Sequence, residues 1–281
     1  MPTFDTPSPI DLAVNLQVGD LEVVAGDRAD TVVTVTPTSP SKEADRRAAE
    51  STRVEFDGAR VTVVAPKPKF SLFGPSESVD VRVELPAGSR LTAEVAYGGT
   101  RSTGRLGATR IKTPGGLVEL GDTGALWVRA GHGNATIGDV DGSAEVTADH
   151  GQIRVGRIAG DARLKASHGS VRVEETGSAV EANLSYGDLD ITRSLGSVTA
   201  KTAYGSITLQ EVVSGSVEVE SGYGQVTVGV SAGTPAWLDL SSKEGRVRNE
   251  LDGDESPSDL ENSVSVMART KYGDIAIRRA R

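Results

Sequence analysis

A nine-residue repeat constrains this chain more than any other feature of its sequence. From Gly142 the sequence divides into nonapeptides such as GQIRVGRIA and GDARLKASH, and the phase resumes after one additional residue, Ser214. Within a nonapeptide, the third and fifth positions are mostly apolar, whereas the second and fourth are mostly polar. Alternation with a period of two predicts a short β-strand with one buried face. The leading glycine predicts a tight corner before that strand.

The nonapeptides are of two kinds that alternate along the chain. One kind ends without a ring, and the other ends in one of the rings His132, His150, His168, Tyr186, Tyr204 and Tyr223. In a meander this alternation would have no purpose, whereas in a solenoid like residues stack on like once per turn. The pattern therefore predicts an all-β, two-sided parallel β-solenoid, or β-roll. Each turn has eighteen residues, formed by two nonapeptide strands, and neighbouring turns lie about 4.8 Å apart.

The rings share the parity of the residues that are expected to face inward. In one repeat, for example, Val180, Ala182 and Leu184 lead by steps of two to Tyr186. We therefore expect each ring to plug the edge of the thin sandwich, just before the glycine turns the chain.

The sequence before residue 96 reads differently from the repeats. Residues 1–95 predict a β-rich capping region with one short helix near 41–51, for which Ser41 is the expected N-cap. Its expected strands are LAVNLQ, LEVVAG, TVVTVTP, RVEFDG, RVTVVAP and VDVRVELP. Residues 96–281 predict the β-solenoid repeat region, with an acidic loop at 249–262 and a closing, hairpin-like strand pair.

Composition excludes several classes of partner and site. The net charge is −9, which argues against nucleic acid because that partner requires a clustered cationic surface. There is no cysteine, so disulfides and zinc–thiolate sites are impossible. No stretch is apolar for the roughly 18 residues that a membrane span needs, and no export signal is apparent. We expect no membrane insertion and a soluble protein in the cytoplasm.

Metal sites are weakly supported by the residue pattern. The repeats lack the regularly placed aspartates of a calcium β-roll. The acidic loop has Pro257 where an EF-hand needs glycine, so a solvated loop is the better interpretation. His132, His150 and His168 occupy one repeat position, which leaves a metal or pH role open. Because tyrosine follows at this position, a flat ring explains it more simply. We assign no metal, cofactor or cofactor-binding residue.

The predicted outward residues do not form a catalytic group. They run Glu145–Arg163–Glu181 on one sheet and Arg154–Arg172–Asp190 on the other. Opposite charges at one repeat position indicate cross-strand ion pairs, whereas a glycoside hydrolase needs two carboxylates about 5–10 Å apart. We expect no enzyme and assign no catalytic residue.

The recurrent G-x-(V/I)-x-(V/I) units and the ending MARTKYGDIAIRRA resemble a bacterial family of β-strand-repeat proteins described as proposed adhesins, a domain of unknown function. The opening FDTPSPIDLAVNLQVGDLEVVAGDRADTVVTV resembles the actinobacterial branch of that family. The resemblance covers nearly the whole chain, and its motifs are structural. It implies the solenoid fold and an adhesin-like role.

Two interaction classes and one enzyme class remain as hypotheses. The first is a non-catalytic β-solenoid scaffold that presents a sheet face to a protein or glycan partner. The alternative is a self-assembling cytoskeletal solenoid of the bactofilin kind, which would need pairable strands at both ends. The third is a carbohydrate-active β-helix enzyme. The non-repeat flanks indicate capped ends, so the sequence favours a discrete scaffold.

Overall fold

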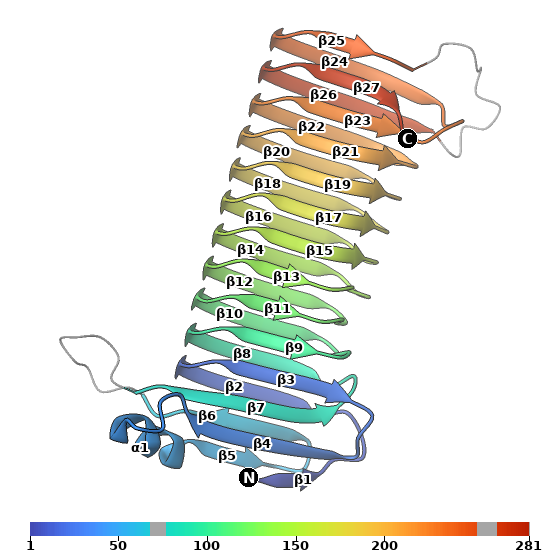
Figure 1. The fold of residues 1–281 in the computed structure, drawn as a ribbon. Helices are drawn as coiled ribbons and strands as arrows, with labels where there is room; N and C mark the ends of the chain where they lie inside the picture. Colours follow the sequence, from blue (N-terminus) through green and yellow to red (C-terminus); the bar gives the residue numbers. More distant parts are fainter. Residues whose placement is uncertain (68–76, 252–262, 281) are drawn as a thin grey trace. The chain divides into compact units, whose positions relative to one another are not determined.

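A computed structural model describes residues 1–67, 77–251 and 263–280 of the chain. It consists of two compact units, Met1–Asp139 and Val140–Arg281. In the second unit, and from β7 (Val79–Pro86) onward in the first, successive strands alternate between two facing sheets (Figure 1). The neighbours in each sheet are parallel apart from three pairs in the first unit. The predicted two-sided parallel β-solenoid is therefore confirmed. We call two successive strands, one in each sheet, a coil.

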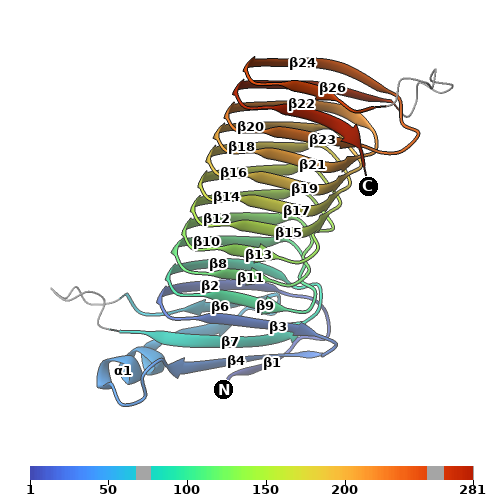
Figure 2. The ribbon, with the colours of Figure 1, turned by 45° about the horizontal axis from the view of Figure 1, so that its top comes forward.

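The second unit contains the regular repeats. Its ring sheet, in which most strands end at a ring residue, has the spatial order β14 (Ala144–His150), β16 (Ala162–His168), β18 (Val180–Tyr186), β20 (Val198–Tyr204), β22 (Gly215–Tyr223), β26 (Val264–Tyr272) and β24 (Ala236–Glu244). The opposite sheet has the order β15 (Ile153–Ile158), β17 (Val171–Thr176), β19 (Leu189–Ser194), β21 (Ile207–Val212), β23 (Val226–Val230), β27 (Ile275–Arg279) and β25 (Val247–Asn249). Figure 2 shows these two layers from a second direction.

The register places each residue beside its counterpart in the next repeat. Ala162 lies beside Val180, and Val180 lies beside Val198, so one coil takes eighteen residues. Val198 then pairs with Val217, because Ser214 adds one residue to that coil. The inward side chains are Val, Leu, Ile and Ala that form a thin apolar core, as the alternation predicts. Val146, Leu164, Ala182, Ala200 and Val219 are at most 1% exposed.

The outward residues form ladders of charge on both sheets. Arg163 lies between Glu145 and Glu181 in register, and its guanidinium is 3.6 Å from the Glu181 carboxylate. On the opposite sheet, Arg172 is 3.6 Å from Asp190. These cross-strand pairs were predicted from the sequence. Each exposed pair contributes only about 0.5 kcal/mol to folding.

The last repeat is placed differently from the expectation. The segments SVSVMART and YGDIAIRR do not form a hairpin, because β26 and β27 lie in different sheets. β26 pairs in parallel with β22 and β24, and β27 pairs in parallel with β23 and β25. The physical reason is the ring–glycine motif Tyr272–Gly273, which makes this segment one more regular coil. The outermost described coil of this unit is β24–β25. The acidic loop predicted at 249–262 lies mostly outside the described residues.

The first unit combines coils with an antiparallel end. One sheet has the order β1 (Thr3–Asp5), β4 (Asp30–Pro37), β7 (Val79–Pro86), β3 (Leu21–Gly26), β9 (Thr100–Thr103), β11 (Val118–Leu120) and β13 (Ala135–Ile137). The other has the order β12 (Leu126–His132), β10 (Thr109–Gly115), β8 (Arg90–Tyr97), β2 (Asp11–Val18), β6 (Arg60–Val64) and β5 (Arg53–Phe56). The two sheets meet at β1 and β5, where the Phe4 and Phe56 rings lie 5.0 Å apart.

The helix α1 (Glu43–Ser51) lies within the segment predicted to be helical. Ser41 is not its N-cap, so that prediction is wrong: the cap position is Lys42, and its side chain makes no capping hydrogen bond. The Ser41 hydroxyl lies 3.2 Å from the Ser39 hydroxyl instead. Asp45 anchors the helix, since its buried carboxylate accepts hydrogen bonds from the backbone N–H groups of Ser39 and Ser78. No helix in the described part of the chain is long and apolar enough to cross a membrane.

Candidate functional site

A row of stacked rings follows one edge of the second unit. Neighbouring ring centroids are 4.7 to 5.0 Å apart, and neighbouring planes are within 3 to 8° of parallel. We call this row the ring ladder; its members are His150, His168, Tyr186, Tyr204, Tyr223 and Tyr272. The spacing equals the distance between neighbouring strands of a sheet. The ladder is thus a direct consequence of the eighteen-residue register.

The rings do not plug the sandwich, so the prediction made from their parity is wrong. Tyr186 is 51% exposed and Tyr204 is 46% exposed, whereas the preceding inward residue Leu184 is 7% exposed. The inward alternation ends with Leu184, because the chain begins to turn at the corner before it reaches Gly187. Each ring therefore points away from the core. Within the ladder, both faces of a ring are covered by neighbouring rings, and its edge remains accessible.

Histidine and tyrosine edges give the ladder a defined chemistry. Imidazole nitrogens and phenolic hydroxyls donate and accept hydrogen bonds, while the ring carbons between them are apolar. The accessible surface is therefore a straight amphipathic strip with the same group repeated at one-strand intervals. Such a strip suits an extended partner better than a compact one.

The stacked histidines are poorly arranged for a metal ion. The centroids of His150 and His168 are 4.8 Å apart in planes that differ by 5°. Two nitrogens that bind one zinc ion lie no more than about 4.2 Å apart, because each Zn–N bond is about 2.0–2.1 Å. Equivalent nitrogens of parallel rings are separated by roughly the centroid distance, which is too far. His132 ends β12 in the first unit. Among the described residues, no three His, Cys, Asp or Glu side chains form a metal-binding group.

Treatment with EDTA is expected to leave the melting temperature of the protein unchanged. A structural metal would stabilise the folded state by its binding free energy, and its removal would lower the melting temperature. Differential scanning calorimetry with and without the chelator checks this prediction. A fall of several degrees in EDTA would require a structural metal ion.

Removal of one ring from the ladder is expected to destabilise the protein modestly. Tyr204→Ala removes two stacking contacts, with Tyr186 and Tyr223, and should lower the free energy of unfolding by about 1–2 kcal/mol. Lys201→Ala on the same strand serves as the control, because its exposed ion pair with Glu220 is worth less than about 1 kcal/mol. Urea denaturation of both variants gives the comparison, and equal losses would contradict a stabilising ladder.

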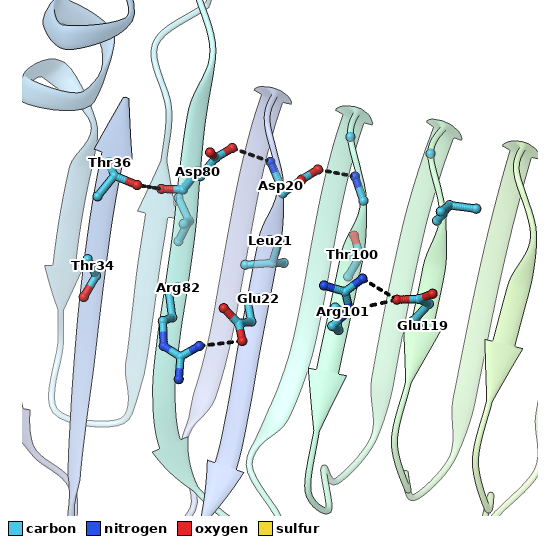
Figure 3. A pocket seen from close by; sticks show the side chains of 15 residues that line it. Asp20, Leu21, Glu22, Thr34, Thr36, Asp80, Arg82, Thr100, Arg101 and Glu119 are labelled. Atoms are coloured by element: carbon cyan, nitrogen blue, oxygen red, sulfur yellow. Dashed lines mark hydrogen bonds and ion pairs between the residues drawn. The ribbon is translucent and has the colours of Figure 1, made fainter. Parts of the chain in front are cut away.

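A second candidate surface lies on the first unit. A groove of about 670 Å³ crosses the outer face of β4, β7, β3, β9 and β11, and Figure 3 shows the side chains that line it. We call it the outer groove. Part of its wall is backbone, because Gly98, Gly99 and Gly116 carry no side chain. Leu117 beside them is 50% exposed.

Charged side chains line the outer groove in pairs. Arg101 donates a hydrogen bond from Nε to a Glu119 oxygen at 2.8 Å, its Nη2 forms an ion pair with the same oxygen at 2.6 Å, and Arg82 pairs with Glu22 (Figure 3). The bond to Glu22 is the main cause that raises the pKa of Arg82, and the bond to Glu119 raises the pKa of Arg101. Both guanidinium groups therefore stay charged at any ordinary pH.

Two aspartates in the groove bind backbone amides. One Asp20 carboxylate oxygen accepts from the N–H of Gly99 at 2.7 Å, and one Asp80 oxygen accepts from the N–H of Asp20 at 3.0 Å. These bonds tie neighbouring coils together at the corner. Each carboxylate keeps a second oxygen. The groove thus offers fixed acceptors beside fixed donors.

Neither surface was identified as a site from the sequence. A signal for the outer groove is present, however: the corners Tyr97–Gly98–Gly99 and Gly115–Gly116–Leu117 depart from the pattern of a ring, one glycine and a polar residue. Two glycines in succession remove a side chain from the surface, and the exposed leucine adds an apolar one. The alternation pattern alone does not indicate that these changes lie side by side.

Residues 10–278 match the family model described as Toastrack DUF4097. The chain belongs to the Toastrack DUF4097 family. The family resemblance inferred from the repeats is thereby confirmed, while the actinobacterial branch stays a prediction. No curated protein matches this Toastrack chain.

Solved bacterial structures also resemble this Toastrack chain. A proposed cell adhesion protein from Clostridium sporogenes has 11% identity and a TM-score of 0.21, with 99% of this chain and 98% of that chain covered. Proposed adhesins from Parabacteroides distasonis and Bacteroides fragilis have 13% and 12% identity and TM-scores of 0.34 and 0.35. For both, 98% of this chain and 95% of that chain are covered. Their adhesive role is a statement about those proteins.

Proposed function

We propose that this protein is a non-catalytic, adhesin-like β-solenoid scaffold that binds a protein or glycan partner through repeated surface groups. The ring ladder carries the proposal. Four tyrosines in unbroken register are each about half exposed, at Tyr186, Tyr204, Tyr223 and Tyr272. Exposed tyrosine supplies contact area at low cost in conformational entropy. A partner that contacts several rings gains affinity from each of them.

The arrangement of the charges supports a binding role over catalysis. A glycoside hydrolase holds two carboxylates in environments that separate their pKa values. On the second unit several outward carboxylates are paired with arginine instead, as Arg193 shows by lying between Glu175 at 3.5 Å and Glu211 at 3.2 Å. Repeated ion pairs of this kind fit a structural surface.

The proposal is tested by removing the ring edges without disturbing the fold. One variant carries Tyr186→Ser, Tyr204→Ser and Tyr223→Ser. The control carries Asn183→Ser, Lys201→Ser and Glu220→Ser on the same three strands. Both are immobilised beside the wild-type protein and exposed to an extract of the native host, after circular dichroism has shown that they are folded. Bound protein and bound sugar are then quantified.

We expect the wild type and the control to retain components of the extract that the ring variant does not retain. The bound components should also be recovered chemically unchanged. Equal retention by all three proteins would contradict the role of the ladder. Retention of nothing above the bare matrix by the wild type would contradict the scaffold proposal itself.

A second candidate function, end-to-end self-assembly, is favoured by one observation. Among the described strands, β24 pairs with β26 alone. Leu238 and Leu240, whose counterparts Val266 and Ala268 are fully buried, remain partly exposed on it. An edge strand with accessible apolar residues invites another chain. Light scattering of wild type and Leu240→Lys tests this candidate: a concentration-dependent rise in mass that the substitution abolishes would support it, and a monomeric wild type would exclude it.

A further inference from the structure

The first unit has a row of ring positions of its own, in which one position is left without a side chain. In register along this row lie Val18, Tyr97, Gly115 and His132. Gly115 therefore occupies the place where the ring-ending coils have a ring. Neighbouring positions along a sheet are about 4.8 Å apart, so the side chains of Tyr97 and His132 start roughly 9.5 Å from each other. We call the space over Gly115 the ring slot.

Tyr97 presents its ring to this slot. A Cβ atom placed on Gly115 would lie 3.6 Å from Cδ1 and 3.8 Å from Cε1 of Tyr97. The tyrosine ring therefore stands directly beside the vacant position. Tyr97 is 61% exposed, more than Tyr186 at 51% or Tyr204 at 46%, whose two faces are covered. The larger exposed fraction of Tyr97 is explained by a ring face that no neighbouring ring covers. One further ring fits at the pitch that the ladder already uses.

The ring slot adjoins the outer groove. Gly98 and Gly99, which line the groove, directly follow Tyr97, and Gly116 and Leu117 directly follow Gly115. A ligand ring in the slot thus has its next chemical unit at the mouth of the groove. The exposed Leu117 side chain gives that unit an apolar contact. Slot and groove together form one continuous surface around the corner of the first unit.

We propose that this surface binds a neutral glycan. One pyranose stacks its C–H face on Tyr97 within the ring slot, and the neighbouring sugars lie in the outer groove. There the carboxylates of Glu22 and Glu119 accept hydrogen bonds from sugar hydroxyls, and the guanidinium of Arg101 donates to them. The proposal rests on the proposed scaffold function and names the partner class for this part of it.

The chemistry of the groove selects a neutral ligand. Four carboxylates line it, at Asp20, Glu22, Asp80 and Glu119, against two guanidinium groups, at Arg82 and Arg101. This excess of negative charge repels a phosphate or an acidic sugar. A flat apolar face beside a few fixed polar groups is typical of a small-ligand site. A pyranose matches it, since its C–H groups face the negative side of an aromatic ring while its hydroxyls point sideways.

The sharpest test fills the slot from within. The backbone of Gly115 is not in the left-handed region, and an added Cβ meets only ordinary contacts. Gly115→Tyr should therefore fold and place a ring where the sugar would lie. Tyr97→Ala removes the stacking platform instead. Lys112→Ala is the matched control, because it removes an exposed side chain from the strand of Gly115, outside the ring slot and the outer groove.

Isothermal titration calorimetry on the full chain measures binding of cellohexaose, maltohexaose and chitohexaose, with a hyaluronan hexasaccharide as the anionic probe. We expect at least one neutral hexasaccharide to bind with a Kd below about 1 mM. Gly115→Tyr and Tyr97→Ala should each weaken it at least tenfold, whereas Lys112→Ala should leave it within twofold. The sugar should be recovered intact.

Several results would overturn the glycan proposal. They are the absence of binding by all three neutral probes, tighter binding of the anionic probe, or affinity that Gly115→Tyr leaves unchanged. The scaffold function would still stand if the ring-ladder variant lost its host component in the extract experiment. If neither glycan binding nor retention of a host component were observed, the proposed scaffold function would be contradicted as well.

Discussion

Val146→Asp is expected to lower the free energy of unfolding by about 4 kcal/mol or more. Val146 is 0% exposed and lies beside Leu164 in the next coil, so an aspartate there would lose its hydration without gaining a partner. Its protonation would reduce the cost without removing it, since a neutral carboxyl group also needs hydrogen bonds. Urea denaturation monitored by circular dichroism gives the value.

The neighbouring residue is the control for that substitution. Glu145→Gln changes an exposed outward side chain on the same strand, and its effect should stay within about 0.5 kcal/mol. A large difference between the unfolding free energies of the two variants would show that successive side chains of this strand point to opposite faces of the sheet. Equal unfolding free energies would show that the strand does not present Val146 to the core.

Gly187→Ala should be nearly as damaging, for a different reason. Gly187 has a φ of 153°, and a Cβ there would lie 2.1 Å from the carbonyl oxygen of Gly169. The two coils cannot separate, because the Gly169 N–H donates to the Tyr186 carbonyl at 2.9 Å, and the Gly187 N–H is held to the following coil in the same way by the Tyr204 carbonyl. Backbone strain and overpacking together should cost about 3 kcal/mol or more.

Gly233→Ala separates these two contributions. Gly233 also has a positive φ, of 74°, but an added Cβ meets nothing within 4 Å. Only the conformational strain remains, which is worth about 1–2 kcal/mol. Thermal unfolding of both variants makes the comparison. Similar losses of stability in Gly187→Ala and Gly233→Ala would contradict the close approach of the Gly187 and Gly169 corners.

The regular part of the fold could be predicted because the same residue pattern recurs in every coil. Alternation fixes which side chains face inward, and the eighteen-residue spacing fixes which residues stack, down to the shift that Ser214 introduces between Val198 and Val217. Once the stacked residues are known, ion pairs such as Arg163–Glu181 can be predicted from the amino-acid sequence.

The errors occur where the repeat meets a corner or an end. Parity assigns Tyr186 to the core, yet the corner rotates the chain beyond Leu184 and leaves the ring outside. The chain forms β24 before β26, yet β26 lies between β22 and β24. The spacing of residues within a repeat does not determine this order of strands in the sheet. The ring slot depends on an absent side chain at Gly115, which becomes visible only when its neighbours in register are known.

The central claim is that equivalent residues of successive coils stack to form an exposed ring ladder. The chain has no cysteine, so Tyr186→Cys and Tyr204→Cys can be combined and labelled with pyrene. We expect strong excimer emission from this pair at concentrations where singly labelled proteins give none. A control pair at Tyr186 and Leu195, which begins the opposite corner of the coil, should show monomer emission only. Excimer emission that is absent from the first pair, or equal in both pairs, would contradict the claim.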